Sequence, residues 1–166
     1  MRSSTQLFAL LLANLLLGAC GFHLREQGAM PFKSIYVETS NPKSPFIAQI
    51  RFGLDYGKVA QATSAKTADV VLQIVSESSE LQILTLDNTG LVTEYRLIYR
   101  VSLHAYDNKK QNWIPATVME LHRDFFYDNS LVLAKSSEQD LLARSMYKEM
   151  AQQILRRLSL AKPQPQ

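Results

Sequence analysis

The residue with the clearest chemical signal is Cys20, the only cysteine in the chain. It follows an apolar stretch at residues 7–17, two small residues close that stretch, and the basic Arg2 precedes it. A basic start, an apolar core of roughly 7–15 residues and a small-residue cleavage site are typical of a secretory signal peptide. A cysteine directly after such a site is where lipoprotein processing attaches acyl chains. We therefore predict a lipoprotein signal peptide at residues 1–19 and lipidation of Cys20.

Two alternatives for this segment stay open: an ordinary signal peptide with an incidental cysteine, and a short transmembrane anchor. The apolar stretch is shorter than the roughly 20 residues that span a bilayer, which disfavours the anchor. A single acyl chain binds a membrane only reversibly, whereas several chains hold a protein there stably. Gly21 follows Cys20, in place of the aspartate that tends to retain lipoproteins in the inner membrane of enteric bacteria. We expect attachment to the outer membrane, on its periplasmic side.

Four basic residues could bind an anion. Arg96 and Arg100 alternate on the polar face of the most regular strand pattern, and Arg123 lies in the next strand. Guanidinium groups suit phosphate or carboxylate because they donate paired N–H bonds. Lys135 stands at the entrance of the last predicted helix, where free backbone N–H groups also favour anions. From spacing alone, a solvated polar face with loose ion pairs is the more frequent explanation of such arginines.

The sequence offers no catalytic constellation. Its three histidines, His23, His104 and His122, lack metal-ligand spacing, and neither a phosphate-binding loop nor a nucleophile elbow occurs. We therefore predict no enzymatic activity, no metal and no cofactor. The formal net charge is +3, and it falls by one when Arg2 leaves with the signal peptide. So small a basic excess does not argue for a nucleic-acid partner.

These groups must be positioned by one domain, which we place at residues 34–160, after a lipidated tether at residues 20–33. A domain of this size can bury a substantial core. With one cysteine, no disulfide can form within the chain, so packing must supply the stability. The Pro- and Gln-rich residues 161–166 are predicted to form a disordered tail.

The first half of the domain is predicted from local signals. Residues 34–39 are β-rich and predict a strand. Ser44 can cap a helix whose first position is Pro45, apolar residues then recur at helical spacing, and Gly57 is a plausible end. The polar residues 58–68 predict a loop that can include a short strand.

The second half is predicted to contain three long strands and a helix. The apolar positions at the start and end of the first long strand are out of phase, which predicts a bulge near Ser78 and Ser79. Hairpin-turn sequences at residues 87–90 and 107–110 separate the strands, whose length suggests that the hairpin ends project. Leu131, Val132 and Ala134 can form a first helical turn or two, and Ser136 and Ser137 then have capping-box spacing, which predicts the start of the main part of the last helix. Its apolar stripe comprises Ala143, Tyr147, Met150, Ala151, Ile154 and Leu158.

The order of these elements is β-α-β-β-β-α. Because each helix has one apolar stripe to bury, both are expected on the same face of the sheet. The predicted fold is therefore an α+β, two-layer sandwich with a four-stranded, mostly antiparallel sheet and two helices on one face.

Several segments of the chain resemble the LptE family, in the same order along the sequence. They are residues 20–25 (CGFHLR), 93–97 (TEYRL), 123–126 (RDFF) and 133–140 (LAKSSEQD). The resemblance covers nearly the whole mature chain and is loose only between Pro42 and Val70. LptE is the lipoprotein of the outer-membrane lipopolysaccharide translocon, and the resemblance implies the same four-stranded, two-helix fold.

The resemblance also implies a non-enzymatic role. Members of the family plug the lumen of the β-barrel LptD, aid its assembly and bind lipopolysaccharide for insertion at the outer leaflet. By this resemblance Lys135 contacts lipid A phosphates. Some members carry a basic residue at the hairpin where this chain has Asp87 and Asn88, so a two-point basic clamp would need Arg96 or Arg100 to substitute.

Two other functional hypotheses stay open. The first is an accessory lipoprotein of another envelope machine, acting as an interaction module without ligand binding. The second is a periplasmic enzyme with an unrecognised site, which the lack of a nucleophile–base pair or metal cluster disfavours.

Overall fold

The computed structural model describes residues 30–128 and 132–165 of the 166-residue chain. The predicted signal peptide, Cys20 and most of the predicted tether lie outside the described residues. The structure therefore does not test the predicted cleavage and lipidation.

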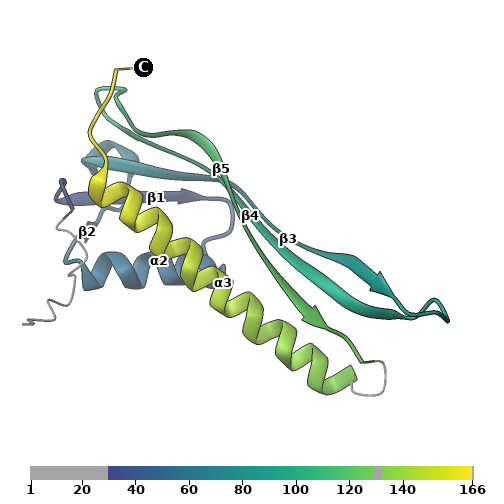
Figure 1. Ribbon diagram of the computed structural model, residues 1–166. Helices are drawn as coiled ribbons and strands as arrows, with labels where there is room; N and C mark the ends of the chain where they lie inside the picture. Colours follow the sequence, from purple (N-terminus) through teal and green to yellow (C-terminus); the bar gives the residue numbers. More distant parts are fainter. Residues whose placement is uncertain (1–29, 129–131, 166) are drawn as a thin grey trace, which may run out of the picture.

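The domain is α+β, with two helices and an open mixed sheet, as predicted (Figure 1). The strand order is β2-β1-β3-β4-β5; β1 is parallel to β2 and β3, while β3–β4 and β4–β5 are antiparallel. The structure has five strands where four were predicted. The additional strand is the two-residue β2, which lies in residues 58–68, the segment predicted to be a loop that can include a short strand. The strands are β1 (Ser34–Thr39), β2 (Ala60–Gln61), β3 (Val70–Leu86), β4 (Val92–Asp107) and β5 (Asn112–Phe126), with a short 3-10 helix, η1 (Ala65–Thr67), and the helices α2 (Pro45–Tyr56) and α3 (Val132–Leu160).

Helix α2 begins and ends as its sequence predicts. The Ser44 side chain accepts a hydrogen bond from the backbone N–H of Phe46 at 3.1 Å, Pro45 occupies the first turn, and Gly57 follows the last residue. The buried side chains of α2 recur at helical spacing and join one core cluster with α3 and the sheet. They are Phe46, Ile47, Ile50 and Leu54.

The sheet extends beyond the part that α2 and β1 cover (Figure 1). Strand β1 pairs with β3 only as far as Thr39 and Ile74, and most later residues of β3 are exposed. We call the distal part of the β3–β5 sheet the blade; it comprises residues 76–86, 92–100 and 118–126. The prediction that the hairpin ends project is therefore confirmed for the β3–β4 hairpin only, because Asn108 in the β4–β5 turn bonds to the carbonyl of Ala68 in the body of the domain.

One local prediction about β3 was wrong in its position, whereas the start of α3 agrees with the predicted first turns before the serines. The register shift in β3 lies between Ile74 and Ser76, before the predicted position at Ser78 and Ser79, because the strand changes its pairing where β1 ends. Helix α3 begins at Val132, upstream of the serines. Residues 129–135 contain no proline or glycine, so nothing local prevents the helix from extending past the capping box.

The tail was predicted to be disordered from composition. In the structure, Asn112 and Gln164 exchange two backbone hydrogen bonds, of 2.8 and 2.9 Å. This part of the tail therefore lies along the edge of β5, beside the start of that strand.

The close approach of α2 and α3 gives a stability prediction at Gly53. A Cβ atom placed there would collide with Cδ1 of Leu155 on α3. Gly53→Val is expected to lower the free energy of unfolding by about 1–3 kcal/mol, because overpacking forces side chains and backbone to shift. Gly57→Ala is the control, because Gly57 has a φ of −74°, which alanine also adopts, and an added Cβ would lie 3.4 Å from the nearest atom, the carbonyl oxygen of Gly53. Urea denaturation that leaves both variants equally stable would contradict this prediction.

A second prediction concerns Asp69, which joins the starts of β1 and β3. Its Oδ2 accepts hydrogen bonds from the backbone N–H groups of Lys33 and Ser34, both at 2.9 Å. These bonds lower the pKa of Asp69 below its ordinary value. A lowered folded-state pKa stabilises the protein above the unfolded-state pKa, and this contribution is lost as the pH falls through the folded-state value.

We therefore expect Asp69→Asn to reduce stability at pH 7 and to lose less stability than the parent on acidification to pH 3. Thermal unfolding at the two pH values measures this. An equal loss in both proteins would show that Asp69 does not contribute to the pH dependence.

Candidate functional site: the charged faces of the blade

Two of the predicted anion-binding arginines lie on the face of β4 that points away from the helices, which we call the open face. Arg96 pairs in register with Asp124 of β5, and its Nε and one terminal N–H group donate to the two carboxylate oxygens at 2.7 and 2.8 Å. This two-point bond raises the pKa of Arg96 and lowers that of Asp124. Such bidentate geometry is the most specific arginine–carboxylate contact.

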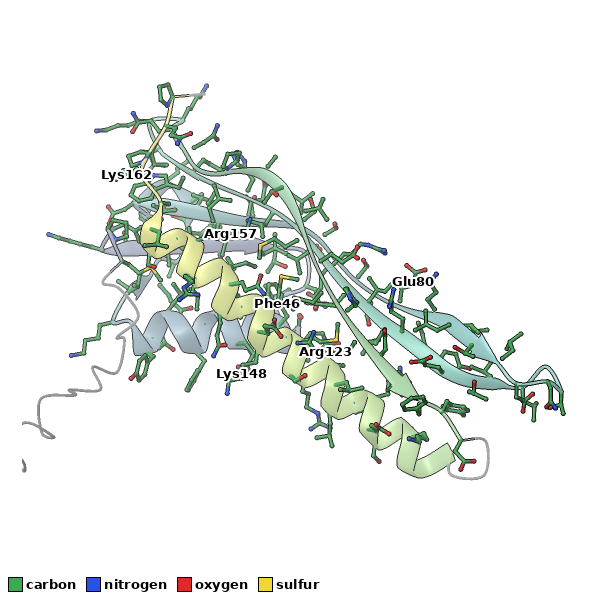
Figure 2. All side chains as sticks on the ribbon, in the orientation of Figure 1. Phe46, Glu80, Arg123, Lys148, Arg157 and Lys162 are labelled. Carbon is green, nitrogen blue, oxygen red and sulfur yellow. The ribbon has the colours of Figure 1, made fainter. Side chains whose placement is uncertain are left out.

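Arg100, also on the open face, bridges all three strands of the blade. It donates to Glu80 of β3 at 2.9 Å and to Glu120 of β5 at 2.6 Å, and both bonds raise its pKa. Figure 2 shows Glu80 on the side of the sheet away from α3. The structure therefore brings Arg96 and Arg100 together in a ladder of cross-strand ion pairs.

The other two candidates lie elsewhere. Arg123 pairs in register with Leu97 on the core face of the sheet and bonds to Glu149 of α3, and Figure 2 shows it beside that helix. Lys135, in the first turn of α3, donates to Glu138 at 2.8 Å, and its side chain is only 18% exposed. Arg123 is thus separated by the sheet from Arg96 and Arg100.

The carboxylates that hold these cations were missed from the sequence. Direct cross-strand neighbours of an antiparallel pair share a face, so the alternation of β5 could have indicated Asp124 and Glu120. Glu80, the partner on β3, could not be indicated in this way. Its position opposite β4 depends on the register shift after Ile74, which changes every later pairing of β3.

The blade also exposes apolar side chains. Residues 81–86 (LQILTL) lie at its distal end and contain neither charge nor proline. An exposed, uncharged strand segment of this kind favours association with another chain. The large exposed apolar residues of the blade and its turn are Leu81, Ile83, Leu86, Leu91, Val118 and Phe126.

Within the described residues there is no group of three or more His, Cys, Asp or Glu side chains that could hold a metal ion. His104 instead contacts the side-chain oxygen of Asn112 at 2.6 Å. Among the same residues, neither helix is both long and apolar enough to cross a bilayer.

This two-layer architecture defines a class of small α+β lipoprotein domains. The crystal structure of rare lipoprotein B from Shewanella oneidensis is similar, with a TM-score of 0.66 and 30% identity, covering 74% of this chain and 90% of that one. The solution structure of lipoprotein B from Nitrosomonas europaea has a TM-score of 0.70 and 28% identity, covering 84% of this chain and 90% of that one.

The chain belongs to the LptE family. The family's sequence model, described as lipopolysaccharide-assembly, matches residues 32–158. The LPS-assembly lipoprotein LptE of Pectobacterium atrosepticum is 28% identical over 92% of this chain and 85% of its own length. The LptE of Yersinia enterocolitica is 28% identical over 95% of this chain and 77% of its own length. Membership of this family is consistent with a role in lipopolysaccharide assembly in the Gram-negative envelope.

Proposed function

We propose that this protein is a non-catalytic outer-membrane lipoprotein that forms a complex with an LptD-type β-barrel, plugs it, aids its assembly and binds lipopolysaccharide for insertion at the outer leaflet. The observation that carries the proposal is the family match over residues 32–158, which spans both helices and all five strands up to Leu158.

Anchoring through Cys20 would hold the domain on the periplasmic side of the outer membrane. The small residues before Cys20 and the apolar stretch before them support this part of the proposal. Multiple acyl chains would make the attachment stable.

The surface of the blade supports a protein partner. Its open face carries charges of both signs in fixed positions, at Arg96, Asp124 and Arg100. Its distal segment, residues 81–86, exposes apolar side chains. A closed barrel has no strand edges to offer, so contact inside its lumen would use side chains and loops of complementary charge and shape.

Lipopolysaccharide binding would use Lys135 first, with Arg96, Arg100 and Arg123 as further candidates. Lys135 stands in the first turn of α3, where backbone N–H groups add positive potential. Because Lys135 is paired with Glu138, a phosphate would have to exchange with that carboxylate. A phosphate carries more negative charge and more acceptor oxygens than a carboxylate, which favours the exchange.

One observation favours an alternative, an accessory interaction lipoprotein of another envelope machine that binds no ligand. Each of the four candidate cations already bonds to a carboxylate of the chain. Lipopolysaccharide binding by the purified protein separates the two functions, since only the first predicts it.

The test of the partner is a detergent pull-down of the acylated protein, tagged at Gln166, from native outer membranes. A stoichiometric large β-barrel that survives stringent washing is the expected result. Recovery of the lipoprotein alone, or with another machine, would contradict the proposed partner.

A further inference from the structure

Most of the lysines lie at the end of the domain opposite the tip of the blade, which we call the basal end. Hydrogen bonds hold its segments together: the Ala60 N–H donates to the Lys33 carbonyl at 3.0 Å, and the tail pairs with the start of β5. Figure 2 shows Lys162 at this end. The segments are residues 30–34, 55–69, 107–112 and 161–165, and their exposed lysines are Lys33, Lys58, Lys66, Lys109, Lys110 and Lys162.

The basal end accounts for the whole positive excess of the chain. The chain has 18 lysines and arginines against 15 aspartates and glutamates, a net charge of +3. The basal end has six lysines and three aspartates, which is the same excess, so the remainder of the chain is neutral on balance. The three carboxylates accept hydrogen bonds from uncharged N–H groups; they are Asp55, Asp69 and Asp107.

The basal lysines differ from the cations of the blade in their pairing. Among the described residues, none of the six forms an ion pair, whereas Arg96 and Arg100 are both bonded to carboxylates. The lowered pKa of Asp69 comes first from the backbone N–H groups of Lys33 and Ser34, and the Lys33 charge contributes less. An external anion can therefore reach the basal ammonium groups without displacing a carboxylate.

The described part of the chain also begins at the basal end. Phe32 packs edge-to-face on Trp113 at the start of β5, with ring centroids 5.4 Å apart, which fixes the first described residues there. Met30 stands ten residues after Cys20, and ten residues span at most about 36 Å. Acylation of Cys20, which is part of the proposed function, would keep the basal end within that distance of a bilayer.

An exposed aromatic side chain accompanies the lysines. Tyr56, the last residue of α2, is 75% exposed and lies two residues before Lys58. Tyrosine is enriched where a membrane meets water, because its ring is apolar and its hydroxyl is polar. Clustered lysines are attracted to anionic lipid headgroups, and a basic patch strengthens the attachment that a lipid anchor provides.

We propose that, before the protein joins its barrel partner, the basal end docks on the anionic phospholipid surface of the membrane that holds the lipid anchor. The six lysines contact headgroup phosphates, and Tyr56 lies at the level of the headgroups. The blade then points away from the bilayer, so residues 81–86 stay free for a protein partner. The docked orientation rests on the proposed anchoring through Cys20.

The first experiment needs no substitution. The acylated protein, purified without its barrel, is added to vesicles of phosphatidylglycerol and phosphatidylcholine and, separately, of phosphatidylcholine alone. Each lysine is acetylated with N-acetoxysuccinimide, and the rates are read by mass spectrometry. On the anionic vesicles the six basal lysines are expected to react at least threefold more slowly, while the exposed Lys43 and Lys148 react equally on both.

Salt gives a second reading of the same experiment. At 1 M NaCl the Debye length is only about 3 Å, so the protection of the basal lysines is expected to disappear. Equal rates on the two kinds of vesicle would overturn the proposal. Equal slowing of Lys43 and Lys148 would also overturn it, because these lysines lie outside the basal end.

A matched pair of double variants tests the patch itself. Lys66→Glu/Lys109→Glu is expected to abolish the protection of the four remaining basal lysines. Lys43→Glu/Lys148→Glu makes the same change of net charge outside the basal end and is expected to preserve that protection. Thermal unfolding checks that both variants are folded. Undiminished protection in folded Lys66→Glu/Lys109→Glu would overturn the proposal.

Two further readings separate this proposal from others. The mass of the purified protein shows whether Cys20 is acylated, so failure of the proposed anchoring is recognised independently of the lysine rates. Absence of protection on anionic vesicles, with Cys20 acylated, overturns the docking alone. Inositol hexakisphosphate then replaces the vesicles: protection equal to that on vesicles would indicate a soluble polyanion as the partner and overturn membrane docking, whereas no protection supports it.

Discussion

Lys135→Glu is expected to weaken lipopolysaccharide binding at least tenfold while leaving the complex with the barrel protein intact. Lys135 is mostly shielded from solvent and is held by Glu138, so its ammonium group has a fixed position in the first turn of α3. Reversing its charge places two carboxylates three residues apart and repels phosphate at the same point. Binding of purified lipopolysaccharide to the full-length protein in detergent measures the effect.

The matched control is Lys148→Glu, which makes the same charge change on an exposed lysine of the same helix. A second variant, Glu138→Gln, makes the prediction sharper. It removes the carboxylate that competes with phosphate for Lys135, so it is expected to increase lipopolysaccharide affinity. If Lys135→Glu and Lys148→Glu have the same effect, or if Glu138→Gln has none, Lys135 is not a specific contact.

Phe125→Ala is expected to lower the free energy of unfolding by about 3–5 kcal/mol, whereas Phe126→Ala changes it by less than about 0.5 kcal/mol. The two residues are neighbours in β5 on opposite faces of the sheet. Phe125 is 5% exposed and stacks on Tyr95 with ring centroids 5.9 Å apart, while Phe126 is 74% exposed. Removing the buried ring leaves a cavity in the core, and removing the exposed one leaves none.

Urea denaturation of both variants measures the difference, and each provides the control for the other because the residue type and position along the strand are matched. Similar losses in both would mean that the blade is not packed on its core face as the structure shows. If Phe126→Ala is as stable as the parent protein, it can also be used in the pull-down. Loss of the barrel protein from that variant would then show that the exposed Phe126 ring contacts the partner.

Local sequence signals predicted most of the fold because they act within a few residues. Ser44, Pro45 and Gly57 define α2 through groups that belong to the helix itself. Alternation placed Arg96 and Arg100 on the polar face of β4. Alternation along β5 could likewise have placed Arg123 on the core face, because its neighbours on that face, Leu121 and Phe125, are apolar.

The groups that require distant segments could not be predicted in this way. The bond from Arg100 to Glu80 depends on where β1 stops and β3 shifts its register. The ion pair between Arg123 and Glu149 joins β5 to α3. Neither arrangement leaves a periodic pattern in the sequence, because its residues meet only after the sheet and α3 have packed.

The parallel pairing of β1 with β3 has a consequence for the order of folding. Strands β3, β4 and β5 are joined by short turns, whereas Ile35 reaches its partner Val70 only across α2 and β2. Closing a long loop costs more entropy than closing a short one, so the meander of β3, β4 and β5 is expected to form first. Until β1 arrives, the edge of β3 at residues 70–74 has unpaired backbone groups and apolar side chains. A newly made chain is therefore most prone to aggregation before β1 docks.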